Sequence, residues 1–255
     1  AMKSKLQSKR AVHHSTTWVT VFCLNVFLTS CSGDGNSPKS STSHIPTHLP
    51  TSTPPPTYSS AQVKARLLTA DEIGNGMREV SPEFLPFQKR KAPSCSLSGI
   101  SLPSDPELIF RQYSNRARHA RDEVKYAQLT ARFDRPADAT KAYNQLKKKA
   151  YSCPSKQYVP PRRVRKNYTL FPHNDTWKVS EGTLLNWSHL RGSEKQVIPR
   201  RYTKHNVLYY TYDYALRGNL VIATAYWERA EPGQSGSPAA QRATEILKKQ
   251  LKKFG

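Results

Sequence analysis

A short apolar run near the N-terminus limits how much of the chain is available to a folded domain. The run covers residues 18–30 and is interrupted by Thr20 and Asn25. Basic residues precede it, and the first acidic residue of the sequence is Asp34. A membrane-spanning helix needs about 20 apolar residues, so this run is too short to cross a bilayer. Its length and basic flank are typical of a signal peptide, which we predict for residues 1–30.

The end of the apolar run indicates what happens after export. Leu28, Thr29, Ser30 and Cys31 resemble the bacterial lipobox, in which an aliphatic residue and two small residues precede a cysteine. The resemblance implies that the Cys31 sulfur carries a diacylglycerol and that the mature chain begins there. We therefore expect a lipoprotein anchored on the outer face of the bacterial cell membrane. The alternative is an ordinary secretory signal, with Cys31 as a spare thiol.

The segment after Cys31 has the composition of a tether. Residues 31–60 are mostly Ser, Thr and Pro and contain almost no large apolar side chains. Such a segment cannot bury enough surface to offset the entropy lost on ordering. We predict a disordered linker over residues 31–60, followed by one folded domain over residues 61–255.

The predicted domain is strongly basic. Without the five basic residues and the one acidic residue of residues 1–60, it keeps 35 Lys and Arg against 17 Asp and Glu, a net charge of +18. Arg162, Arg163 and Arg165 form the run best suited to grip phosphate, because guanidinium groups bind it in a bidentate manner. We expect either an anionic cell-wall polymer or lipid head groups as the partner, or simply a solvated surface. Export and the lack of a recognisable motif argue against nucleic acid.

Cysteine use indicates one disulfide. If Cys23 is removed with the signal peptide and Cys31 is acylated, only Cys95 and Cys153 remain. In an oxidising compartment such a pair normally forms a bridge. Zinc binding is the weaker alternative, because no histidine lies near either cysteine in the sequence. We predict no metal site and no cofactor.

Hydrophobic periodicity predicts an α+β domain with a mostly antiparallel sheet flanked by helices. The expected helices cover residues 70–76, 136–152 and 238–253. Residues 81–106, which contain five prolines, are expected to be irregular. The expected strands cover residues 108–119, 123–133, 168–171, 183–189, 200–202, 207–218 and 220–230, with a hairpin turn between the last two.

Motifs give little support for catalysis. Neither a Gly-x-Ser-x-Gly elbow nor a His-Glu-x-x-His motif occurs, and the segment Gly233–Ser237 reads as a flexible turn. Tyr210, Tyr212 and Tyr214 alternate onto one face of a strand, where they either line a ligand cleft or pack beneath a helix. We expect a non-enzymatic domain, with an extracytoplasmic hydrolase as an alternative.

Four segments together resemble a known family. They are residues 67–74, residues 131–153, the strand pair at 207–227 and the closing helix at 239–254. They are similar to the actinobacterial extracellular sensor domains, which form the outer part of mycobacterial receptor serine/threonine kinases and also occur in lipoproteins. The resemblance implies an antiparallel sheet flanked by helices, a cleft for an unidentified small ligand and no established catalysis. It also implies a Cys95–Cys153 bridge, whereas the second cysteine pair of the kinase members is missing here.

Overall fold

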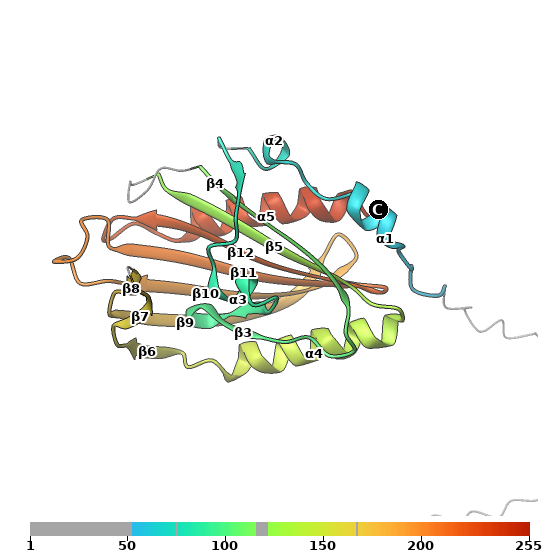
Figure 1. The fold of residues 1–255 in the computed structure, drawn as a ribbon, viewed down its shortest axis with the longest axis horizontal. Coiled ribbons are helices and arrows are strands. Elements are labelled where there is room, and N and C mark those ends of the chain that lie inside the picture. The colour runs from blue at the N-terminus through green and yellow to red at the C-terminus, as the bar shows by residue number, and fades with distance from the viewer. Residues whose placement is uncertain (1–52, 75, 116–121, 167) are drawn as a thin grey trace, which may run out of the picture. The chain divides into compact units, whose positions relative to one another are not determined.

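A computed structural model describes residues 53–74, 76–115, 122–166 and 168–255 of the chain (Figure 1). Cys31, the predicted signal peptide and most of the predicted tether lie outside these residues. The described part forms an eight-stranded antiparallel sheet in the order β1-β4-β5-β12-β11-β10-β9-β6. Its strands are β1 (Arg78–Val80), β4 (Glu107–Ser114), β5 (Val124–Arg132), β6 (Lys156–Val159), β9 (His173–Leu184), β10 (Trp187–Val197), β11 (Val207–Arg217) and β12 (Leu220–Ala230).

Helices cover both faces of this sheet, and the sheet lies between α4 and α5 in Figure 1. One side, here called the α4 face, carries the long α4 (Pro136–Ser152) and a run of short elements: α3 (Leu85–Gln88), β2 (Ala92–Ser94), η1 (Cys95–Leu97) and β3 (Ser98–Ile100). The other side, the α5 face, carries α1 (Ser60–Ala65), α2 (Ala70–Ile73) and α5 (Ser237–Lys252). The predicted α+β class is therefore confirmed. No helix among the described residues has the length and apolar character needed to cross a membrane.

The two central strands form the hairpin expected from the sequence. β11 ends at Arg217 and β12 begins at Leu220, so Gly218 and Asn219 make the turn. Gly218 has φ +55°, and a Cβ there would lie 1.7 Å from the carbonyl oxygen of Pro56. The Asn219 side chain binds both the N–H and the carbonyl of Tyr58, at 2.8 and 3.0 Å. Tyr58 is buried, so the packed part of the chain begins before the predicted domain boundary at residue 61.

The strands toward the β6 edge of the sheet differ from the prediction. Residues 183–189 contain a tight turn between β9 and β10, with Leu185 and Asn186 at φ +50° and +65°. Residues 183–184 and 187–189 do lie in strands, but in two different ones, so the prediction missed the turn between them. Residues 200–202 form a turn, so the strand predicted there is wrong. The real strand β9 was missed because its inward positions include the polar His173 and Asp175, which hide the apolar alternation.

The two long helices follow their sequence signals. Pro136 is the first residue of α4, where its missing N–H costs no hydrogen bond. Helix α5 buries the five apolar residues that its spacing predicts: Ala239, Ala243, Ile246, Leu247 and Leu251. The short helix α2 stops at Ile73 because Gly74, at φ +86°, ends it before residue 76.

The Cys95–Cys153 disulfide is present and joins η1 to the end of α4. The two Cα atoms lie 6.3 Å apart. Residues 81–106, expected to be irregular, instead contain α3, η1 and the two-stranded β2–β3 sheet. The bridge therefore fixes this group of short elements on the α4 face.

Candidate ligand-binding groove

An open groove of about 890 Å³ lies where β5 and β12 meet the start of α5. Residues of β11, of β12, of the turn after it and of the first turns of α5 line it, among them Tyr209, Glu228, Arg229, Gln234 and Arg242. Small-molecule sites typically have volumes of about 300 to 1,000 Å³. The groove therefore has the size of a small-ligand site.

Arg242 and Glu228 form the ion pair at the centre of this groove. Arg242 Nη2 donates to Glu228 Oε2 at 2.5 Å, and Arg242 Nε donates to the other carboxylate oxygen. The Tyr226 hydroxyl donates to the same carboxylate. The Arg242 side chain is 43% exposed and that of Glu228 only 13%. The bidentate bond to Glu228 raises the pKa of Arg242, so a fixed and partly accessible cation faces the groove.

A second ion pair, Arg229 with Glu123, contributes to the lining of the groove. Arg229 Nε donates to Glu123 Oε2 at 3.0 Å, and Arg229 Nη1 donates to the carbonyl of His205 at 3.0 Å. Both side chains are almost fully buried. A buried pair that is hydrogen-bonded in this way is rigid, because separating it would leave an uncompensated charge.

The amino end of α5 forms one wall. Gly236 is the N-cap residue and supplies no side-chain cap. The Tyr209 hydroxyl donates to the carbonyl of Gln234, and a Cβ at Gly236 would lie 2.6 Å from Cδ1 of Tyr209. The tyrosine ring therefore packs directly on the turn that leads into the helix. A helix N-terminus carries partial positive charge, which adds to that of Arg242.

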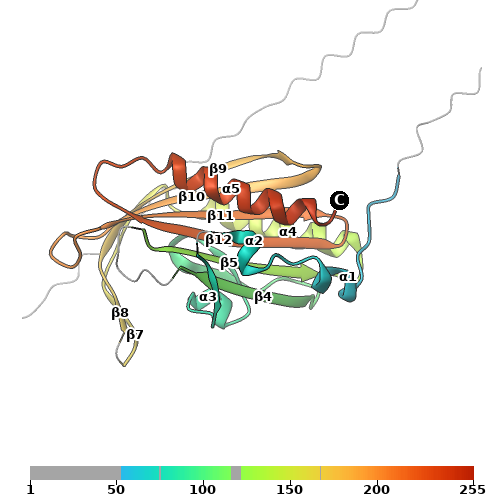
Figure 2. The same cartoon turned by 90° about the horizontal axis from the view of Figure 1, so that it is seen from above.

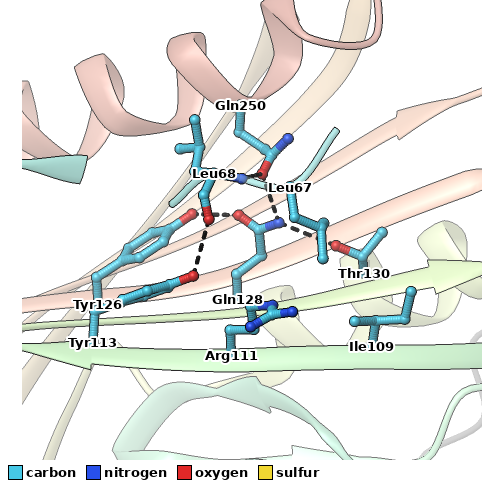
Figure 3. A pocket seen from close by; sticks show the side chains of 9 residues that line it. All are labelled: Leu67, Leu68, Ile109, Arg111, Tyr113, Tyr126, Gln128, Thr130 and Gln250. Carbon is cyan, nitrogen blue, oxygen red and sulfur yellow. Dashed lines mark hydrogen bonds between the residues drawn. The ribbon is translucent and has the colours of Figure 1, made fainter. Parts of the chain in front are cut away.

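A buried polar network holds α5 in register with the sheet (Figure 3). Gln128 Nε2 donates to Gln250 Oε1 at 3.0 Å, and Gln250 Nε2 donates to the carbonyl of Arg66 at 2.8 Å. The Tyr126 hydroxyl donates to Gln128 Oε1 at 2.6 Å. The cavity beside these side chains measures only about 10 Å³, which is room for about one water molecule. This cavity belongs to the packing of α5 and is too small for a ligand.

The three tyrosines predicted to share one face do so. Tyr210, Tyr212 and Tyr214 point to the α4 face and are buried in its core. The Tyr214 hydroxyl donates to the carbonyl of Pro93, and the Tyr212 ring lies 5.5 Å from that of Trp177. They line neither of the two cavities described above, which favours the packing alternative. The groove is lined instead by the neighbouring Tyr209. Successive residues of a strand point to opposite faces of the sheet, so Tyr209 lies on the face opposite to that of Tyr210.

The predicted arginine run forms one strand of a separate hairpin. Strand β7 (Arg162–Arg165) pairs with β8 (Tyr168–Leu170), and the register shifts between Arg163 and Arg165. Arg163 Nη2 donates to the carbonyl of Lys166 at 2.7 Å, so this guanidinium binds its own turn. The side chain of Arg165 lies outside the described part of the structure.

Two buried carboxylates on the α4 face were not expected from the sequence. Asp175 and Glu194 are 3% and 2% exposed, and both bind Ser96 beside the disulfide. The Ser96 N–H donates to the two oxygens of Glu194 at 2.9 and 3.1 Å. Burial and the nearby Asp175 raise the pKa of Glu194 to about 7. Ser96 itself has φ +52°, so this cluster fixes η1 in an unusual conformation.

The described histidines do not assemble a catalytic or metal site. His173, His189 and His205 each approach a different carboxylate, those of Asp175, Asp213 and Glu231. Within the described residues, no group of three or more His, Cys, Asp and Glu side chains is arranged to hold a metal ion. His119 lies outside the described residues.

Comparison with known proteins supports the fold. No protein-family model matches the chain, and no curated protein matches it in sequence. Among solved structures, it is similar to the extracellular domain of PknH from Mycobacterium tuberculosis, with a TM-score of 0.50 and 13% identity. The match covers 77% of this chain and 98% of that domain. This likeness agrees with the family resemblance read from the sequence, at the level of fold.

Proposed function

We propose that this protein is a non-enzymatic, sensor-like ligand-binding domain held on the outer face of a bacterial cell membrane by an acylated Cys31. The fold shared with an extracellular domain supports an extracytoplasmic location. The disulfide supports it as well, because such bridges persist in oxidising compartments. The lipobox-like residues before Cys31 supply the anchor in this proposal.

The groove at the start of α5 is the proposed ligand site. The observation that carries the proposal is the fixed pair of Arg242 and Glu228 within a groove of ligand size. Arg242 and the α5 amino end offer positive charge, while Asp122 and Glu228 offer negative charge. A small polar ligand with an anionic group against Arg242 suits this arrangement.

The contacts of the groove favour binding over catalysis. A general base or nucleophile has to lie within hydrogen-bond reach of the reacting atom. Here both oxygens of the Glu228 carboxylate accept hydrogen bonds from Arg242, and the Tyr226 hydroxyl donates to one of them as well. These contacts occupy the carboxylate. Its geometry suits the rigid positioning of a ligand.

Native mass spectrometry of the protein purified from its host tests the ligand site. We expect a small molecule to remain bound to the wild type and to be lost from Arg242→Ala, by at least about tenfold because a charge-assisted contact contributes about 1.5 to 3 kcal/mol. Arg135→Ala is the matched control, because it removes a bidentate pair with Asp138 at the start of α4. Equal occupancy in Arg242→Ala and wild type would rule out this site.

A further inference from the structure

Two basic segments lie together at the end of the sheet far from the described N-terminus. Residues 154–174, which contain the β7–β8 hairpin, and residues 195–212, which contain the β10–β11 loop, include no Asp or Glu. In Figure 2 the hairpin leaves the body of the domain, and the loop extends from the same end. The charged side chains of these two segments are therefore all basic, and Glu231, just after β12, lies beside the loop at 3.4 Å from His205 Nδ1.

An exposed aromatic stack joins the two segments. The Phe171 ring, at the base of the hairpin, stacks on the Tyr202 ring of the loop, with centroids 4.9 Å apart and planes 21° apart. The two residues are 39% and 40% exposed. The Arg201 guanidinium lies 5.0 Å from the centroid of Tyr202. The contact between these two rings joins the β7–β8 hairpin and the β10–β11 loop into one surface.

Exposed basic side chains lie on both segments. Arg162, Lys166, Arg200, Arg201 and Lys204 are all exposed. Tyr158, on the edge strand β6, adds a ring that is 62% exposed. Exposed large apolar side chains are unusual enough on a soluble domain that several at one end indicate contact with another surface.

We propose that this surface, here called the hairpin end, docks on an anionic lipid bilayer. Basic side chains near an anionic membrane are attracted to it, and their contributions add. Aromatic side chains prefer the membrane interface, where an apolar ring and a polar edge are both satisfied. A soluble anionic polymer would use the cations alone, so the Phe171–Tyr202 stack favours the bilayer. The chain from Cys31 to Ser52 reaches at most about 70 Å, long enough for an anchored domain to turn this end to the membrane.

Vesicle sedimentation with residues 52–255 tests the proposal without the lipid anchor. This fragment is a compact unit that contains the whole described sheet, both long helices and the disulfide. We expect it to bind phosphatidylcholine vesicles that contain phosphatidylglycerol and not pure phosphatidylcholine vesicles. Binding should fall steeply as salt is raised, because exposed charges are screened within about 8 Å at physiological ionic strength.

Two variants separate the charges from the rings. Arg162→Glu/Arg201→Glu should weaken vesicle binding by at least about tenfold. Phe171→Ser/Tyr202→Ser should weaken binding to vesicles and leave binding to soluble polyphosphate unchanged. Lys248→Glu/Lys252→Glu, two exposed positions on α5, is the charge-matched control and should retain binding.

Three results would overturn the proposal. The first is the absence of binding to anionic vesicles. The second is an equal loss in the α5 control, which would indicate a diffuse charge effect. The third is vesicle binding that survives Phe171→Ser/Tyr202→Ser, which would favour an anionic polymer as the partner.

Discussion

Replacing Glu194 by glutamine should remove a pH dependence from the stability of the domain. The Glu194 carboxylate is buried and accepts the Ser96 N–H and, at 2.8 Å, the Gln196 side-chain amide. Burial is the largest cause of its raised pKa, and repulsion by Asp175 is the next. Glutamine keeps the size and the acceptor oxygen of this side chain and removes its charge.

The sign and size of the effect follow from proton binding. The pKa of Glu194 is about 7 in the folded chain, against 4.5 for an ordinary glutamate. Below pH 4.5 both states hold the proton, so the group contributes no pH dependence. Between pH 4.5 and 7 the folded state binds more protons, and the free energy of unfolding therefore falls as pH rises. At about 1.4 kcal/mol for each pH unit, the loss amounts to about 3 kcal/mol, complete above pH 7.

Urea unfolding at pH 5 and pH 8, with the disulfide intact, measures this difference. We expect the free energy of unfolding of Glu194→Gln to fall less between the two pH values than that of wild type. Glu245→Gln, at an exposed position on α5, controls for the loss of an ordinary carboxylate. If wild type and Glu194→Gln show the same pH dependence, the buried carboxylate does not titrate as described.

Two further changes test the packing of the α4 face. Cys95→Ser/Cys153→Ser opens a loop with a sequence separation of 58 residues and should lower the free energy of unfolding by about 4 kcal/mol, measured by urea unfolding; a loss below about 1 kcal/mol would contradict this. Gly192→Ala should cost about 1 to 3 kcal/mol, because its Cβ would lie 2.0 Å from Cη2 of Trp177. Gly182→Ala, which meets no atom within 4 Å, is the control, and an equal thermal shift for both would refute the clash.

The sequence predicts an element correctly where its turn or cap residues and its pattern of apolar residues indicate the same structure. The hairpin at Gly218 and Asn219 was predictable because apolar strands flank a turn-forming pair. Helix α4 was predictable because Pro136 marks its start and apolar residues recur at helical spacing. Each signal lies within a few residues of the element that it defines.

The edge strands and the candidate groove depend on distant contacts. Strand β9 buries Asp175 against partners distant in sequence, Ser96 and Gln157, which both donate hydrogen bonds to its carboxylate. The groove joins Glu123 of one hairpin to Arg229 and Arg242 of later elements, a juxtaposition that no local pattern contains. Tyr209 and Tyr210 show the limit of periodicity: alternation separates the two faces but does not tell which face meets a cavity.

Metabolic labelling with a clickable fatty acid, combined with protease treatment of intact cells stripped of their wall, tests the central claim most directly. We predict that wild type is labelled and fractionates with membranes, and that external protease digests its folded domain. Cys31→Ser should lose the label and leave the membrane fraction. Equal labelling of wild type and Cys31→Ser, or a domain protected inside the intact membrane, would contradict the account.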